Sequence, residues 1–187
     1  ITPDKETGIG NYTYDEFKNA VKHGVRKDNS ALYPAMPYPS YQIMPDEDMA
    51  AMYAYFMSDV KAVNQPNLKS EMPPVLNWRW PLAYWQAIFA PERAFVPESD
   101  NTVLVRGQYL VEGPGHCGSC HTVRGIGFQE IALNNADSEE YLSGGRMPET
   151  PHDRMAFTMP EFINLSDVDV AEVFNYVRNS LANQAPE

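Results

Sequence analysis

The sequence predicts an all-α fold, and three observations support this class. Stretches with apolar residues at three- and four-residue spacing recur along the chain, and they begin or end with residues typical of helix ends. No alternation of polar and apolar residues, which would indicate strands, surrounds the two cysteines. Apolar residues at 43% are enough for packed cores, while 16 prolines predict long irregular connections between the helices.

The first predicted helix lies within residues 12–24. Thr13 followed by Glu16 forms a capping-box pattern, in which each side chain satisfies a backbone N–H of the other at the helix start. Gly24 is placed to end the helix, because glycine readily takes the left-handed conformation found there. The predicted apolar face consists of Phe17, Ala20 and Val21.

Two further helices are predicted over residues 45–60 and 166–182. Pro45 and the acids that follow it suit a first helical turn, and Ser166 with Asp169 forms a second capping pattern. The predicted apolar stripes are Met49, Met52, Tyr53, Phe56 and Val60 in the former and Val170, Val173, Phe174, Val177 and Leu181 in the latter.

A Met-Pro pair between aromatic residues precedes each of these two helices. Met36 stands in "YPAMPYPSY" (33–41) and Met159 in "FTMPEF" (157–162). The order of Met-bearing loop and helix therefore occurs twice, which we interpret as an internal repeat. The alternative is two ordinary loop–helix units whose methionines fill the core.

Both cysteines of the chain lie in "GHCGSCHT" (115–122), and a histidine follows the second one directly. A disulfide framework needs more cysteines, a structural zinc site needs further ligands, and a thiol redox motif usually follows a strand. The C-x-x-C-H pattern of Cys117, Cys120 and His121 instead matches the attachment signature of c-type haem, in which two thiols bind the porphyrin edge and the imidazole ligates iron. We therefore predict covalent haem c, with a haem-free dithiol or metal protein as the alternative.

The flanks of the motif fit haem attachment. Tyr109, Leu110 and Val111 predict a short helix before it, which would pack against the helix near the end of the chain. The residues Gly113, Pro114 and Gly115 would then let the backbone turn tightly against a flat ligand. A methionine opposite the histidine is the usual electron-transfer pair.

Two long segments resemble a known family. Residues 1–60, with "ITPDKETGIGNYTYDEFKNAVKHGVRKDNSALYPAMPYPSY", and residues 103–133, with "RGQYLVEGPGHCGSCHTVRGIGFQE", are similar to the multihaem cytochrome c subunit of bacterial membrane-bound dehydrogenases. Residues 155–180 resemble the end of that family's last haem domain. The family serves alcohol, gluconate, sorbitol, fructose and aldehyde dehydrogenases.

This resemblance implies what the chain does and where. It implies electron transfer from a flavin or PQQ-type dehydrogenase subunit to ubiquinone or onward to a terminal oxidase, with more than one haem per full-length chain. Haem attachment implies the bacterial periplasm, at the outer face of the inner membrane. A free-standing electron-shuttle cytochrome without a permanent partner is the alternative. The subunit itself would not be an enzyme, because no substrate reaches it.

The chain departs from the family pattern in two places. The sequence holds no attachment motif for the first module, so the haem of Met36 is expected to be held by residues before Ile1. No signal peptide is expected within the given sequence. Compared with the family pattern, a stretch is also expected to be missing after Gly145. In the chain as it stands, Met159 is predicted as the sixth ligand of the haem on His121. There are two alternatives: Met147 takes that place, or Met159 belongs to a third haem.

Three regions are predicted: an incomplete cytochrome c module over 1–63, a Pro/Trp-rich linker over 64–102, and a cytochrome c module with covalent haem over 103–187. The last region could combine parts of two family domains joined near residue 145. Within the linker, "NWRWPLAYWQAIFA" (77–90) holds all three tryptophans. It is predicted either to contact a membrane interface or partner, or to fill the groove between the modules.

The charge of the chain excludes one class of partner. A formal net charge of -11 does not provide the positive surface that nucleic-acid binding requires. An acidic surface suits a soluble protein or one that docks on a basic partner. The sequence has no apolar run of the length needed to cross a bilayer, so any membrane contact is predicted to be peripheral.

Overall fold

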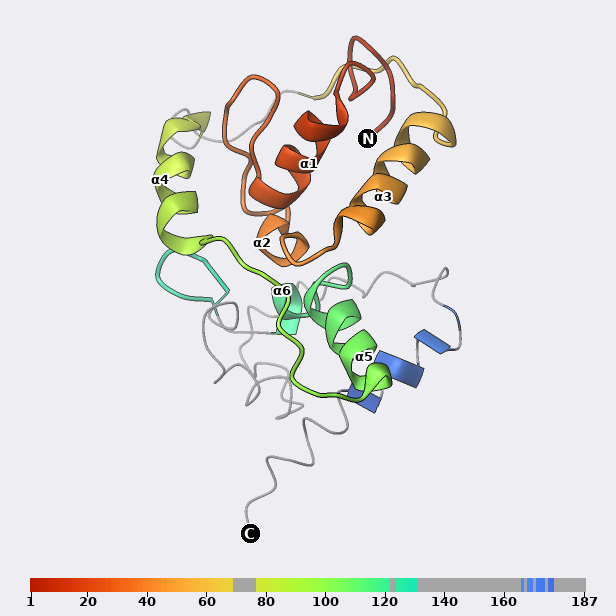
Figure 1. Cartoon of the computed structure of the whole chain (residues 1–187). Coiled ribbons are helices and arrows are strands. Elements are labelled where there is room, and N and C mark those ends of the chain that lie inside the picture. Colours follow the sequence, from red (N-terminus) through yellow and green to blue (C-terminus); the bar gives the residue numbers. More distant parts are fainter. Residues whose placement is uncertain are drawn as a thin grey trace, which may run out of the picture. The chain divides into compact units, whose positions relative to one another are not determined.

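The computed structural model describes residues 1–68, 77–121 and 124–130, together with positions 166, 168, 169, 171–173, 175 and 176. The chain divides into two compact units, Ile1–Ala94 and Phe95–Glu187. In the described residues the regular structure is helical, apart from two isolated β-bridges, which confirms the all-α class there. The helices are α1 (Tyr14–His23), α2 (Tyr38–Tyr41), α3 (Asp46–Ser58), α4 (Trp80–Phe89), α5 (Thr102–Glu112) and α6 (Gly118–His121) (Figure 1).

Helix α1 begins and ends as predicted. The Glu16 backbone N–H donates to the Thr13 hydroxyl at 3.3 Å, and the Thr13 N–H donates to the Glu16 carboxylate at 2.8 Å. Gly24 follows the last turn with a φ of 64°, a left-handed conformation that favours glycine. The capping box therefore fixes the first turn, and a glycine ends the helix before the loop that leads to Met36.

The core of the first unit forms where α1 packs on α3. Met49 of α3 is completely buried. The Phe17 ring of α1 lies 5.4 Å from the Tyr53 ring and 6.1 Å from the Phe56 ring, measured between centroids. The Tyr53 hydroxyl also donates to the Tyr12 carbonyl at 2.8 Å, so this amphipathic pair is fixed by apolar packing and a hydrogen bond.

Helix α4 packs on the first unit. Its Trp85 ring meets the Tyr38 ring edge-on, with 6.4 Å between centroids, and its Gln86 amide donates to the Gly24 carbonyl at 2.9 Å. A side chain at Gly24 would lie within 2.8 Å of both Tyr38 and Gln86, so glycine also provides the space for this contact. The part of the predicted linker from residue 77 to residue 94 is accordingly included in the first unit.

In the second unit, α5 crosses the C-terminal helix, whose described residues lie between Val168 and Tyr176. A Cβ atom at Gly107 of α5 would lie 2.3 Å from the Glu172 carbonyl oxygen, so the two backbones touch at this glycine. Arg106 lies beside the crossing, 3.5 Å from the Asp169 carboxylate. The predicted packing of this helix on the helix near the chain's end is therefore confirmed.

The C-terminal helix starts with the predicted cap. The Ser166 N–H donates to the Asp169 carboxylate at 3.0 Å, and the Asp169 N–H donates back to the Ser166 hydroxyl at 3.2 Å. The predicted stripe did not include Tyr176, which is buried against α5 and directs its hydroxyl to Glu112 at 3.4 Å. The remaining stripe positions, Val170, Phe174, Val177 and Leu181, lie outside the described side chains.

Two loops with unrelated sequences have the same shape. Residues 25–31 and 124–130 each close with a bridge between the first and the seventh residue. In both, the fifth residue has a φ of 60°, Asn29 in one loop and Phe128 in the other. The hydrogen bonds also match: Arg26 N–H to Ser30 O and Asn29 N–H to Arg26 O in the first, Gly125 N–H to Gln129 O and Phe128 N–H to Gly125 O in the second.

Candidate functional site

The haem-attachment motif lies on a single helical turn. Cys117 directly precedes α6, which runs from Gly118 to His121. Positions 120 and 121 follow position 117 by three and four residues, the spacing of about one helical turn. The thiol residue Cys117 is half-buried, whereas the side chains of Cys120 and His121 lie outside the described part. This backbone placement fits the two-thiol, one-imidazole attachment of c-type haem.

The chain before the motif folds back tightly on the end of α5. The Gly115 N–H donates to the Leu110 carbonyl at 2.8 Å, and the Cys117 N–H donates to the Val111 carbonyl at 3.0 Å. A Cβ atom at Gly115 would stand 2.3 Å from the Leu110 oxygen. The predicted tight turn is thus present, and in the described residues the close approach that requires glycine is to the backbone of α5.

A polar cluster that sequence reasoning missed supports the motif from the following loop. The Ser119 hydroxyl donates to the Glu130 carboxylate at 2.7 Å, and the Arg124 guanidinium donates to the Ser119 carbonyl at 2.6 Å. Arg124 also lies 3.6 Å from the Glu130 carboxylate. Glu130 is only 6% exposed, so its charge is held inside the second unit. Charged residues at this spacing are usually solvated, and the sequence carries no signal that distinguishes this pair.

Met36 lies in a tight turn just before α2. Its N–H donates to the Tyr33 carbonyl at 3.1 Å, and its carbonyl accepts the N–H of Tyr38 at 2.8 Å. Met36 is half-buried, while Tyr38 is almost completely buried. The predicted proline-rich, non-helical setting of this methionine is confirmed. Met159 and Met147 lie outside the described residues.

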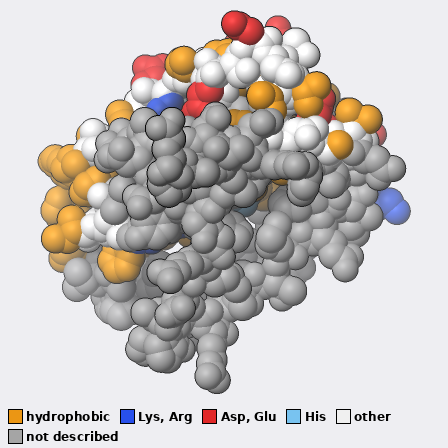
Figure 2. Space-filling view, turned by 90° about the horizontal axis from the view of Figure 1, so that it is seen from below, with side chains coloured by type: hydrophobic (Ala, Val, Ile, Leu, Met, Phe, Trp, Pro, Cys, Tyr) orange, Lys and Arg blue, Asp and Glu red, His pale blue; other side chains and the backbone are white. Residues whose placement is uncertain are grey.

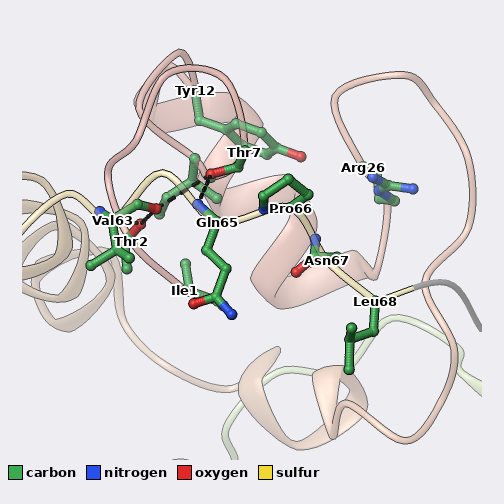
Figure 3. A pocket seen from close by; sticks show the side chains of 12 residues that line it. Ile1, Thr2, Thr7, Tyr12, Arg26, Val63, Gln65, Pro66, Asn67 and Leu68 are labelled. Atoms are coloured by element: carbon green, nitrogen blue, oxygen red, sulfur yellow. Dashed lines mark hydrogen bonds between the residues drawn. The ribbon is translucent and has the colours of Figure 1, made fainter.

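A cavity of about 650 Å³ lies in the first unit (Figure 3). It is bounded by the N-terminal loop, by Arg26 and by the segment from Val63 to Leu68. The Gln65 N–H donates to the Thr7 hydroxyl at 3.1 Å, which holds this segment beside the N-terminal loop. Met36 is not among the residues that line the cavity, so the cavity and the Met36 turn are separate features.

Comparison with known proteins identifies the relatives of the chain. It is 57% identical over 150 residues to the gluconate 2-dehydrogenase cytochrome c subunit of Pantoea cypripedii, covering 79% of this chain and 34% of that protein. It is 53% identical over 147 residues to the cytochrome c subunit of the quinone alcohol dehydrogenase of Gluconacetobacter polyoxogenes, covering 78% and 31%. This chain is a relative of dehydrogenase cytochrome c subunits. No family model matches it.

These cytochrome c relatives are much longer than the chain, which spans about a third of their length. The fructose dehydrogenase cytochrome subunit of Gluconobacter japonicus is 34% identical over 213 aligned residues, covering 96% of this chain and 43% of that subunit. Because the aligned length exceeds the 187 residues of the chain, that subunit carries residues without a counterpart here. A stretch missing relative to the family was one of the expectations from the sequence.

Proposed function

We propose that this chain is part of a c-type cytochrome subunit that accepts electrons from a dehydrogenase and passes them on. The observation that carries the proposal is the C-x-x-C-H sequence of Cys117, Cys120 and His121, whose backbone runs from the residue directly before α6 to the last residue of that helix. Similarity to cytochrome c subunits over more than three quarters of the chain supports it. The subunit transfers electrons and performs no substrate chemistry of its own.

Each residue of the motif has a defined role in this proposal. The thiols of Cys117 and Cys120 hold the porphyrin through thioether bonds, and His121 provides the axial nitrogen. The bound haem iron supplies one-electron oxidation and reduction. The chain contributes the fixed spacing of the three ligating positions and the hydrogen bond that the Ser119 hydroxyl donates to Glu130.

The donor in this proposal is a flavin or PQQ-type dehydrogenase in the bacterial periplasm, and the acceptor is ubiquinone or a terminal oxidase. The acidic surface implied by a net charge of -11 favours docking on a basic face of the partner. A free-standing shuttle cytochrome is the competing function. It would purify without a dehydrogenase, whereas a subunit would copurify with one at fixed ratio.

Electron transfer is tested by spectroscopy on the intact dehydrogenase complex. Addition of the sugar or alcohol oxidised by the copurifying dehydrogenase is expected to reduce the haem within the enzyme's turnover time, seen as sharpened visible bands. Complex from which the cytochrome subunit has been removed should oxidise the substrate with an artificial acceptor but not with a quinone. Haem that stays oxidised while the quinone is reduced would contradict the proposal.

We also propose Met159 as the sixth ligand of the haem on His121. Met159→Ala is expected to open a coordination position, so that carbon monoxide binds the reduced haem and the reduction potential falls, because thioether ligation favours ferrous iron. Met147→Ala serves as the control and should change neither property. If Met159→Ala leaves carbon monoxide binding unchanged, the ligand is Met147 or a methionine outside this chain.

Met36 is proposed as the sixth ligand of a second haem. Both cysteines of the chain lie in the motif at 117–120, so the attachment residues of this second haem lie elsewhere in the full-length subunit. The support is the turn between Tyr33 and Tyr38, which fixes the Met36 backbone on both sides by hydrogen bonds.

Peripheral attachment to the membrane is proposed through one side of α4. In the part of the chain that the structure describes, no helix has the length and apolarity to cross a bilayer. The side chains of Trp80, Tyr84 and Ile88, spaced four residues apart, are each about two thirds exposed. Figure 2 shows hydrophobic side chains gathered over this helix, on the left in that view. No Asp or Glu occurs from residue 72 to residue 91, although the chain holds 25 of them.

Exchange of the exposed aromatic residues of α4 is expected to weaken membrane attachment. The double variant Trp80→Ser, Tyr84→Ser should bind vesicles of bacterial lipid at least about tenfold more weakly. Each substitution removes an aromatic ring whose burial in the membrane interface would contribute well over about 1 kcal/mol. Tyr55→Ser is the matched control, since Tyr55 is an exposed aromatic residue on α3. Equal cosedimentation of all variants would show that α4 does not contact lipid.

A further inference from the structure

Helix α4 contacts both residues that hold Met36 in its turn. The Met36 N–H donates to the carbonyl of Tyr33, and the Met36 carbonyl accepts from the N–H of Tyr38. The Arg79 guanidinium at the start of α4 lies over the Tyr33 ring, 4.7 Å from its centroid. Trp85, farther along α4, meets the Tyr38 ring edge-on. One helix thus fixes the turn from both sides of the methionine.

Arg79 makes a second contact with the same loop. Its guanidinium donates to the Ala31 carbonyl at 2.9 Å, in a partly buried position. Ala31 itself is buried and closes the loop of residues 25–31 through its bridge to Val25. The planar guanidinium therefore joins Ala31, at the end of this loop, to the ring of Tyr33. A shorter or non-planar cation would make these two contacts less well.

We propose that α4 braces the Met36 turn, and that Arg79 is the positioning residue that holds this turn in the conformation from which Met36 would ligate the haem iron. This inference rests on the proposed role of Met36 as a ligand. An iron–thioether bond is weak enough that the protein must hold the methionine in place, since a loop free to move would exchange sulfur for water or another side chain. Arg79 acts through Tyr33 and Ala31 and does not touch the haem in this proposal.

The test compares Arg79→Gln with Met36→Ala in the full-length subunit carrying all its haems. The readouts are the absorption band at the red edge of the ferric spectrum, which reports Met–iron bonding, the pH at which it disappears, and carbon monoxide binding after reduction. Arg79→Gln is expected to shift the equilibrium between bound and released Met36 towards the released form by on the order of tenfold, since it removes a cation–π contact and weakens a hydrogen bond. The pH midpoint should fall by about one unit accordingly.

Two controls make the result specific. Arg26→Gln removes the same charge from the same unit, but Arg26 contacts the exposed Asp28 carboxylate at 3.8 Å, and it should leave the band unchanged. Arg79→Lys keeps the cation over Tyr33 and should restore part of the stability of the bond. Should Arg79→Gln fail to accumulate, Gln86→Leu removes the contact of α4 with the Gly24 carbonyl and should show the same change in smaller measure.

The outcomes separate the inference from its basis. If Met36→Ala leaves the band and carbon monoxide binding unchanged, Met36 is not a ligand and the proposed function of this residue fails. If Met36→Ala removes its share of the band while Arg79→Gln, or Gln86→Leu in its place, behaves as the unaltered protein, Met36 is a ligand and the bracing role of α4 is overturned.

Discussion

Replacement of both Cys117 and Cys120 by alanine is expected to abolish covalent haem on this module and to prevent residues 103–187 from folding. Both thioether bonds disappear, and the porphyrin that would fill the centre of the module is no longer held. Haem staining after denaturing electrophoresis of the corresponding fragment measures the bound haem, and acid–organic extraction of the unaltered fragment should leave the haem on the polypeptide.

Ser119→Ala is the control for these cysteine variants. It lies between the two cysteines and removes only the hydroxyl that donates to Glu130. It should retain covalent haem and lose about 1.5 to 3 kcal/mol of stability, the usual contribution of a hydrogen bond to a charged group. Haem that can be extracted freely from the unaltered fragment would contradict covalent attachment, and so would staining that survives in the double variant.

Gly107→Val is expected to destabilise the second unit by about 3 kcal/mol or more, because overpacking at a rigid contact forces backbones apart. The first added carbon would already lie 2.3 Å from the Glu172 carbonyl oxygen, and a backbone atom cannot turn away as a side chain can. The urea midpoint for loss of the second unit's helical circular dichroism measures the effect. The separation of α5 from the C-terminal helix would expose Tyr176.

Gly125→Ala provides the comparison for Gly107→Val. An added carbon at Gly125 would also meet atoms at 2.1 Å, but these belong to the end of the flexible Gln129 side chain, which can move aside. This variant should therefore unfold within about 1 kcal/mol of the unaltered protein. Equal urea midpoints for the two glycine variants would show that the helices do not touch at Gly107.

Local signals in the sequence predicted the helices and the attachment turn well. Thr13 with Glu16, and Ser166 with Asp169, form caps from residues only three positions apart, so the pattern contains the whole interaction. The C-x-x-C-H motif is equally local, because its residues lie within five consecutive positions that end in one helical turn. These features required no knowledge of the rest of the fold.

Contacts between distant residues could not be predicted in the same way. Helix α4 is apolar on most of its surface, so periodicity did not show which side faces Tyr38 and which faces outward. The partners of Tyr176 and Glu130 likewise depend on how helices and loops meet. The sixth ligand of a haem is a problem of this second kind, since it joins a methionine to an iron across the fold.

The matching loops at 25–31 and 124–130 have a consequence for any structural comparison of the two units. The first loop follows α1 and precedes Met36, whereas the second follows the attachment turn, so they occupy different places in the chain order. Seven residues that close over an antiparallel bridge therefore take the same backbone path at different places in the chain. A superposition seeded on these loops would align the end of α1 with α6, which do not correspond in the predicted repeat. The helix that follows each Met-Pro pair is the start point that the predicted repeat gives for such a comparison.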